Sequence, residues 1–204
     1  FAGMFRYSQL LQDINEADTS ILSNITTVKM YKYVTPTLSS GLKYTLSFNN
    51  ALYNPHSGHN SSGGGIISST GFKINNDDSL NEHFLDDDGA GVLRVYYLSD
   101  TTRVYTDSTY GTVDYANGEV VLTSANITSI SNIDGGTSSV IRVFVVPNSN
   151  DIVPVRNQVL SIDTSNSTIT GEVDGIESGS SQAGTSYTTS SSYSSGSSGS
   201  SSTY

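Results

Sequence analysis

The clearest chemical candidate in the chain is a run of carboxylates, Asp86, Asp87 and Asp88, followed by glycines within residues 89–91. Clustered carboxylates on a flexible loop offer the oxygen ligands that Ca²⁺ prefers. However, their spacing does not match the alternating D-x-[DN]-x-[DN]-G pattern, and successive side chains of an extended segment point in opposite directions. Asp and Gly are also common in turns. We therefore predict a polar turn before a strand that starts at Val92, with a calcium site at the three aspartates as the alternative.

The histidines give a weaker metal signal. His56 and His59 have a spacing that occurs in metal sites, but two imidazoles need a third ligand and rigid surroundings. Asn, Ser and Gly surround them, which predicts an exposed loop. The chain has no Cys, so thiolate metal sites, disulfides and thiol catalysis are excluded. We expect neither a metal nor a cofactor.

Catalysis by a nucleophile or by paired carboxylates has little support. No G-x-S-x-G sequence occurs, so the sharp turn that exposes a catalytic Ser is not indicated. Asp and Glu are plentiful enough for a glycosidase pair, but the chain lacks Trp, a common surface for stacking sugar rings. We predict that the protein is not an enzyme and has no catalytic residues. A carbohydrate-active enzyme is the last of three hypotheses.

The charge balance disfavours two classes of partner. Lys and Arg total 9 against 19 Asp and Glu, which gives a net charge of −10. An acidic chain without a basic cluster has no electrostatic attraction for nucleic acid or for anionic lipid. No segment approaches the roughly 20 apolar residues that span a bilayer, so we expect a soluble protein. Because the chain opens on Phe1, we expect a processed terminus or a piece of a longer protein.

The first part of the chain, residues 1–22, is predicted to be a helical segment. Tyr7, Leu10, Leu11 and Ile14 recur at the spacing of one helical face, while polar residues occupy the other. A helix of about 10–12 residues is marginal alone in water, so this apolar stripe must dock on something.

After the helix the apolar pattern changes to the alternation of strands. Residues 42–48 alternate apolar and polar side chains, as in a half-buried antiparallel strand. Residues 25–34 are a second candidate, with Val28, Met30 and Val34 inward.

An Asn-Gly pair at residues 117–118, between two alternating runs, is a strong hairpin signal. Asn-Gly supplies the positive φ angles of a two-residue type I′ turn. This turn predicts that Tyr115 pairs with Val120 and Val113 with Leu122.

The remaining strand candidates are residues 92–98 and 103–106, which flank a turn at 99–102, residues 140–146 and residues 158–163. Residues 140–146 are apolar on both faces apart from Arg142, so we expect this strand to lie centrally and to end at Pro147. Together these strands predict a mainly β domain over residues 23–176, with an antiparallel sheet or sandwich and one short N-terminal helix. An α+β fold is the alternative.

The end of the chain, residues 177–204, is a low-complexity tail in which 22 of 28 residues are Ser, Gly or Thr. Such a segment buries too little apolar surface to offset the entropy of ordering it. We expect a flexible tail in the isolated chain, which a neighbouring subunit could order.

Several blocks of the sequence match the pattern of a known family. They are FRYSQLL (5–11), SNITTVKM (23–30), YTLSFNN (44–50), FLDDDG (84–89), GTVDY (111–115) and DIVPVRNQ (151–158). Together they resemble the C-terminal region of the large baseplate wedge subunit of T-even-like contractile-tailed phages, particularly those of cyanophages. The resemblance covers most of residues 5–190 and includes no catalytic signature.

This resemblance implies a structural role in the virion. In that family two copies associate in each wedge with other wedge proteins, and six wedges join in a ring around the tail hub. The ring changes shape when the sheath contracts. The protein would then be a homo-oligomer of the tail baseplate, assembled in the host cytoplasm. The Ser/Gly-rich tail departs from the family pattern.

The candidate contact surface comprises the helix stripe and an extended apolar segment, with the residues Tyr7, Leu10, Leu11, Ile14, Ile152, Val153 and Val155. Both elements are apolar and lie near an end of the predicted β domain. The alternative is that both pack on the domain's own sheet. The second functional hypothesis is an extracellular β-domain that binds calcium or glycans, motivated by residues 86–88 and the stalk-like tail.

Overall fold

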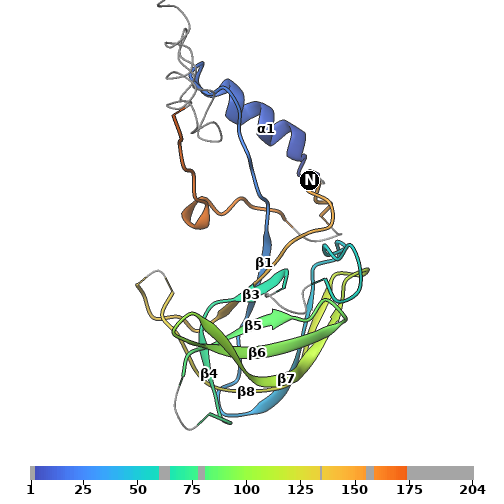
Figure 1. Cartoon of the computed structure of the whole chain (residues 1–204), viewed down its shortest axis with the longest axis vertical. Helices are drawn as coiled ribbons and strands as arrows, with labels where there is room; N and C mark the ends of the chain where they lie inside the picture. The colour runs from blue at the N-terminus through green and yellow to red at the C-terminus, as the bar shows by residue number, and fades with distance from the viewer. Residues whose placement is uncertain (1–2, 60–64, 78–80, 134, 155–158, 174–204) are drawn as a thin grey trace, which may run out of the picture. The chain divides into compact units, whose positions relative to one another are not determined.

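The computed structural model describes residues 3–59, 65–77, 81–133, 135–154 and 159–173. The chain divides into two compact units, Phe1–Leu160 and Ser161–Tyr204, each considered by itself. In its described part the first unit is mainly β, with one α-helix and antiparallel sheets that form a small barrel-like sandwich (Figure 1). The predicted fold class is confirmed. The boundary between the two units follows Leu160. The sequence predicted boundaries after residues 22 and 176, and residue 176 lies outside the described residues.

The helix α1 (Tyr7–Glu16) spans the residues whose spacing predicted it. Its preceding residue provides no side-chain cap. Instead Asp151, far away in the sequence, accepts a hydrogen bond of 2.8 Å from the Tyr7 backbone N–H. A carboxylate at this position satisfies a free N–H group and interacts favourably with the positive end of the helix dipole. The start of α1 is therefore fixed by the chain that follows the last strand.

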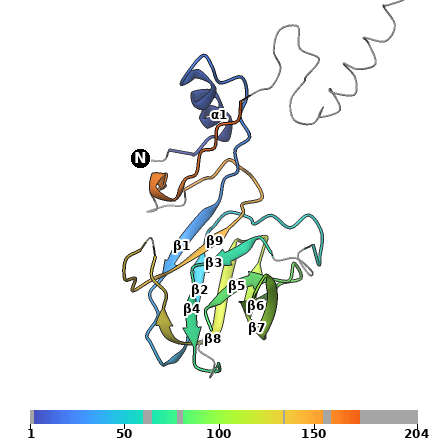
Figure 2. The ribbon, with the colours of Figure 1, turned by 60° about the vertical axis from the view of Figure 1, so that its left-hand side comes forward.

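The smaller sheet, within the described residues, contains three antiparallel strands in the order β1 (Met30–Val34), β9 (Ile141–Val145) and β3 (Ile67–Ser69) (Figure 2). β9 is central, as its two-sided apolar pattern predicts. The strand ends before Pro147, which has no N–H for the ladder.

The larger sheet, within the same residues, contains six strands in the order β2, β8, β4, β5, β6 and β7. Their bounds are β2 (Gly41–Ser47), β4 (Phe72–Ile74), β5 (His83–Asp87), β6 (Val92–Ser99), β7 (Thr102–Asp114) and β8 (Glu119–Ile130). β8 pairs with both β4 and β7, so the strands from β4 to β8 close on themselves. Closure pairs backbone groups that an open sheet would leave at its edges.

Apolar side chains from both sheets join a common hydrophobic core. β9 contributes Val143 and Val145, and β8 contributes Val120 and Leu122, all at most 1% exposed. Phe72 of β4 is among the largest fully buried side chains. Burying one such side chain contributes roughly 1.5–3 kcal/mol, so the alternation seen in the sequence accounts for much of the stability of this body.

The predicted turn between β7 and β8 is wrong, although the hairpin exists. A four-residue loop, 115–118, joins the strands, and Val113 pairs with Val120. A type I′ turn needs two successive residues with positive φ, but within this loop only Gly118 has one, at +67°. The register differs from the prediction by two residues, which keeps each side chain on its predicted face.

Two contacts explain the longer loop. The Asp114 carboxylate accepts hydrogen bonds from the Asn117 backbone N–H at 3.0 Å and from the Asn117 amide at 2.7 Å. Gly118 lies against Asn50, where a Cβ would come within 2.0 Å of the Asn50 carbonyl oxygen. An Asp before the loop and a Gly at its end thus favour a capped turn over the two-residue one.

Three other strand predictions have mixed outcomes. The turn between β6 and β7 is present, with Ser99 paired to Thr102 and Asp100 at a φ of +54°. The strand predicted at residues 25–34 begins only at Met30. The strand predicted at 158–163 is wrong for its described residues, 159–163, which form no strand and leave Val159 89% exposed. Apolar alternation forms a strand only where a neighbouring strand pairs with it.

The second unit contains a short 3-10 helix at Thr164–Asn166 within its described residues. The Asp163 carboxylate accepts hydrogen bonds from the backbone N–H groups of Ser165 and Asn166, at 3.1 and 3.2 Å. This is the usual way in which Asp begins a helical turn.

Candidate functional site

The acidic run does not form the polar turn that the sequence predicts. Asp86 and Asp87 belong to β5 and are 1% and 0% exposed. The turn prediction is therefore wrong for these two residues. It holds for Asp88, whose carboxylate accepts hydrogen bonds from the N–H groups of Ala90 and Val92 at 2.8 and 2.9 Å.

Asp86 is the centre of a buried charge cluster. Its Oδ1 accepts a hydrogen bond from Arg94 Nε at 2.9 Å, and its Oδ2 accepts from Arg103 Nη1 and Tyr105 Oη at 2.8 Å each. The Arg94 guanidinium lies over the Tyr105 ring, 4.4 Å from its centroid. Burial and the hydrogen bond to Asp86 raise the pKa of Tyr105. The charge of Asp86 is therefore compensated within β5, β6 and β7.

Asp87 connects the two sheets. Its Oδ1 accepts a hydrogen bond of 3.0 Å from the Ile67 N–H in β3, and its Oδ2 accepts one of 2.7 Å from the Tyr115 hydroxyl. Burial, followed by the hydrogen bond to Asp87, raises the pKa of Tyr115, so the phenol stays protonated and donates. A Cβ at Gly65 would lie 1.5 Å from Asp87 Oδ1, so only glycine permits this approach.

These contacts give no support to the calcium alternative at Asp86, Asp87 and Asp88. Neighbouring side chains of a strand point to opposite faces, and each carboxylate is engaged by its own donors. Ca²⁺ takes about 6–8 converging oxygen ligands. Over the described residues, no group of three or more His, Cys, Asp or Glu side chains is arranged to hold a metal ion.

The histidines lie in two different environments. His56 and His59 are exposed in the predicted loop, with His59 Nδ1 3.3 Å from His56 Nε2. His83, which the sequence did not single out, is 0% exposed in β5. Its Nε2 lies 3.0 Å from Thr106 Oγ1 and 3.4 Å from Asp77 Oδ2. Burial lowers the pKa of His83, and the charge of Asp77 opposes this effect.

The predicted contact residues of α1 are half-buried. Tyr7, Leu10, Leu11 and Ile14 occupy one side of the helix, and no residue of α1 is buried. The chain returns along the helix, since the Asn24 amide donates to the Leu11 carbonyl at 3.2 Å. This segment covers the apolar stripe only in part.

The second predicted contact segment lies at the start of α1. Ile152 and Phe5 exchange backbone hydrogen bonds of 2.9 and 3.1 Å. Val153 exchanges hydrogen bonds of 3.2 Å with the Asn50 side chain. Ile152 is 6% exposed and Val153 is 51% exposed. The Ile152 side chain is therefore buried in the first unit, whereas the Val153 side chain faces solvent. Val155 lies outside the described residues.

Other large apolar side chains are exposed close by in the sequence. Leu22 is 75% exposed and Ile25 is fully exposed, both between α1 and β1. Met4, before the helix, is 42% exposed. A stretch of chain that exposes several large apolar side chains is typical of an interaction surface. We call residues 4–25, together with Val153, the leading surface.

Sequence reasoning missed Arg94, Arg103 and Tyr105. The turn between β6 and β7 places Tyr105 opposite Tyr96, which local spacing could have revealed. The turn before Val92 was predicted, but no strand was predicted ahead of it, so the pairing that places Asp86 opposite Arg94 was missed.

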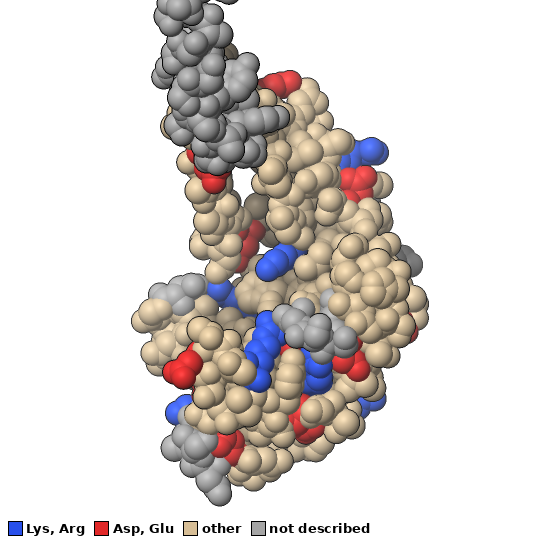
Figure 3. Space-filling view, in the orientation of Figure 1, with Lys and Arg blue, Asp and Glu red and all other residues tan. Residues whose placement is uncertain are grey.

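The visible surface carries mixed charge. In Figure 3, basic side chains lie beside acidic ones over the region of β5 and β6, while the surface around α1 is mostly uncharged.

No helix in the described part of the chain has the length and apolar character needed to cross a bilayer. In comparisons with protein-family models, with curated proteins and with solved structures, the chain matched none.

Proposed function

We propose that the protein is a structural subunit of a phage tail baseplate wedge, which assembles with copies of itself and with other wedge proteins. The blocks that resemble the large wedge subunit support this role. The observation that carries the proposal is the leading surface, where α1 has no buried residue and Leu22 and Ile25 stand in solvent.

Physical chemistry favours a partner for this surface. A helix of 10 residues is marginal without tertiary contacts. Each large apolar side chain that a partner buries contributes roughly 1.5–3 kcal/mol. Because the net charge is −10, contact through the apolar stripe of α1, opposite its polar face, keeps Asp13 and Glu16 out of the interface.

The runner-up is an extracellular β-domain that binds calcium or glycans, and its calcium part is less well supported. Both oxygens of Asp86 are engaged by Arg94, Arg103 and Tyr105. Displacing these donors for a cation would leave two buried or half-buried guanidinium groups without their partner.

The proposal is tested by the oligomeric state of the chain. We expect sedimentation velocity to show a dimer or larger species at micromolar concentration. Leu10→Asp and Ile14→Asp each place a charge in the apolar stripe of α1 and should shift the species to monomer. A wild-type chain that stays monomeric at high micromolar concentration contradicts the proposal.

The matched control is Leu38→Asp, because Leu38 is 48% exposed before β2 and outside the leading surface. This variant should keep the wild-type oligomeric state. Circular dichroism checks that all variants retain the β signal. Equal dissociation by Leu10→Asp and Leu38→Asp would mean that the association is not specific to α1.

A further inference from the structure

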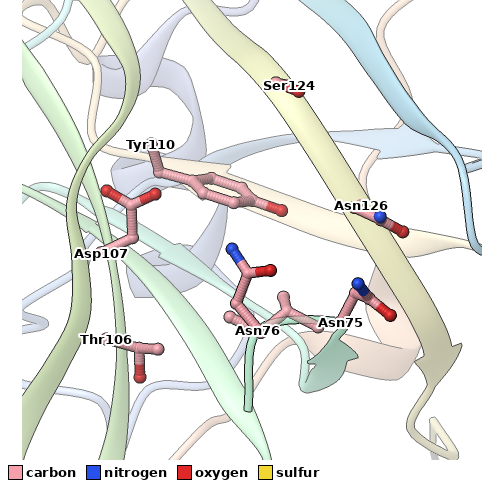
Figure 4. Close-up of a pocket in the computed structure, with 8 residues that line it drawn as sticks. Asn75, Asn76, Thr106, Asp107, Tyr110, Ser124 and Asn126 are labelled. Carbon is pink, nitrogen blue, oxygen red and sulfur yellow. The ribbon is translucent and has the colours of Figure 1, made fainter.

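Outside the charge cluster, polar side chains gather at a small pocket and in a surface loop. The pocket has a volume of about 80 Å³, and Tyr110 of β7 and Asn126 of β8 are part of its lining (Figure 4). Its volume and mostly polar lining suit a few water molecules, each of which needs roughly 10–15 Å³. The loop carries His56 and His59, whose ring nitrogens lie close together.

The spacing of the two imidazoles matches the ligand spacing of tetrahedral zinc. His59 Nδ1 lies 3.3 Å from His56 Nε2, and the rings are nearly perpendicular, at 84°. This distance is slightly longer than the roughly 2.7–3.2 Å of an ordinary N–H···O hydrogen bond. Zinc–nitrogen bonds of about 2.0–2.1 Å place two ligands of a tetrahedron about 3.3–3.4 Å apart. Octahedral ligands at the same bond length would be about 2.9 Å apart.

The loop that carries the pair is anchored on the turn between β5 and β6. The Gly89 carbonyl accepts hydrogen bonds from the Gly58 N–H at 3.0 Å and from the Asn54 amide at 3.1 Å. Within the loop, the His59 N–H donates to the His56 carbonyl at 3.1 Å, which closes a turn. Both imidazoles are therefore attached to backbone that other strands hold in place.

The other ring nitrogen of His56 has the kind of partner that a metal-bound imidazole usually has. His56 Nδ1 lies 3.3 Å from the Ser57 carbonyl oxygen, which can accept its proton in a hydrogen bond. Nε2 then has a lone pair for a metal. A backbone carbonyl in this position fixes the tautomer and the ring orientation of a metal ligand.

Two imidazoles fill only half of a tetrahedral site. Among the described residues, no group of three His, Cys, Asp or Glu side chains is arranged to hold a metal, and for lack of further ligands the sequence predicts no metal here. However, His56 and His59 are both exposed, so a second copy can bring the same pair to the same ion. A two-fold axis through the ion then supplies four nitrogen ligands, the number of a structural zinc site.

Charge also favours a cation between two copies. Each chain has a net charge of −10, so two copies repel each other. A divalent ion at their contact offsets part of this repulsion.

We propose that His56 and His59 of two copies together bind one Zn²⁺, which links the chains. This contact adds a metal-dependent step to the self-association proposed above, and it uses none of the residues of the leading surface.

The first test is sedimentation velocity of Leu10→Asp, the variant designed to prevent association through the leading surface. The chain is compared at micromolar concentration with EDTA and with half an equivalent of Zn²⁺. We expect zinc to double the mass and EDTA to reverse the change. His56→Gln and His59→Gln, each added to Leu10→Asp, should abolish the doubling. The control is Asp100→Asn, which removes an exposed carboxylate elsewhere in the body and should retain the doubling.

The two proposals fail in different arms of this experiment. A wild-type chain that is monomeric with EDTA contradicts association through the leading surface. A Leu10→Asp chain whose mass does not respond to zinc contradicts the zinc site.

The second test replaces Zn²⁺ with Co²⁺, because tetrahedral Co²⁺ absorbs visible light far more strongly than the hydrated, six-coordinate ion. We expect the tetrahedral spectrum to saturate at one Co²⁺ per two chains and to be lost in His56→Gln. Three results would overturn the proposal. They are the absence of zinc-dependent doubling, equal doubling in His56→Gln, and a cobalt spectrum that stays six-coordinate.

Discussion

The β body, residues 30–147, and the leading surface use the same apolar residue types in opposite ways. Leu85 and Val95 of the body are at most 1% exposed. In residues 3–29 no side chain is buried, and Leu22 is 75% exposed. The body thus buries a core of apolar side chains, although some such as Tyr33 and Leu98 stay exposed, whereas the leading surface buries none.

Acidic side chains show the same contrast. Asp86 is buried and bound by Arg94 and Arg103 in neighbouring strands. Asp13, on α1, is exposed and accepts a hydrogen bond from Gln9 one turn away. One carboxylate is part of the fold, and the other is a solvated helix residue. Matched substitutions in the two regions can therefore measure how far this difference extends.

The largest effect is expected at Asp86. Asp86→Ala leaves Arg94 and Arg103 without their shared carboxylate, and removing one partner of a buried ion pair costs about 3–5 kcal/mol. Asp13→Ala should leave the stability of the body unchanged. Urea denaturation followed by circular dichroism gives both free energies of unfolding. Similar small losses in both variants would mean that the charge cluster is not part of the stable body.

A matched pair of leucines gives the next effect. Leu85→Ala removes a side chain that is 1% exposed and should cost about 2–5 kcal/mol. Leu22→Ala alters a residue that is 75% exposed and should change stability by less than about 0.5 kcal/mol. The same urea measurement applies. A comparable loss at Leu22 would show that the leading surface is packed within the isolated chain.

Patterns that local spacing determines were predicted from the sequence. The apolar stripe from Tyr7 to Ile14 predicted the helix α1, and the apolar run at 140–146 predicted that β9 is central. Both follow from the periodicity of the element and need no knowledge of its neighbours. The same reasoning failed for residues 159–163, where apolar alternation has no strand to pair with.

Features that depend on which strands pair could not be predicted. Asp86 was assigned to the turn because Asp and Gly follow it, but its burial depends on Arg94 in β6 and on Arg103 in β7. The loop at 115–118 was also misjudged, since Asn50 and Asp114 determine its length. Tyr110 of β7 and Asn126 of β8 line one small pocket, which no short pattern encodes.

The smallest effect concerns pH and again separates buried from exposed residues. Burial lowers the pKa of His83, although Asp77, close to its Nε2, opposes the shift. The imidazole Nδ1 is buried and has no hydrogen-bond partner in the described residues, so the folded state favours the neutral form. The stability that this group contributes is therefore present above the unfolded pKa of about 6.5. It is lost as the pH falls below that value.

We therefore expect the free energy of unfolding of the wild type to decrease from pH 7.5 to pH 5.5, with a slope contribution from His83 of at most about 1.4 kcal/mol per pH unit. His83→Gln should remove that part of the slope even if it lowers stability at every pH. His56→Gln, at an exposed histidine of the same body, is the matched control. An unchanged slope in His83→Gln would mean that the folded state accommodates the imidazolium as readily as the unfolded state does. The contrast between buried and exposed groups would then not extend to protonation.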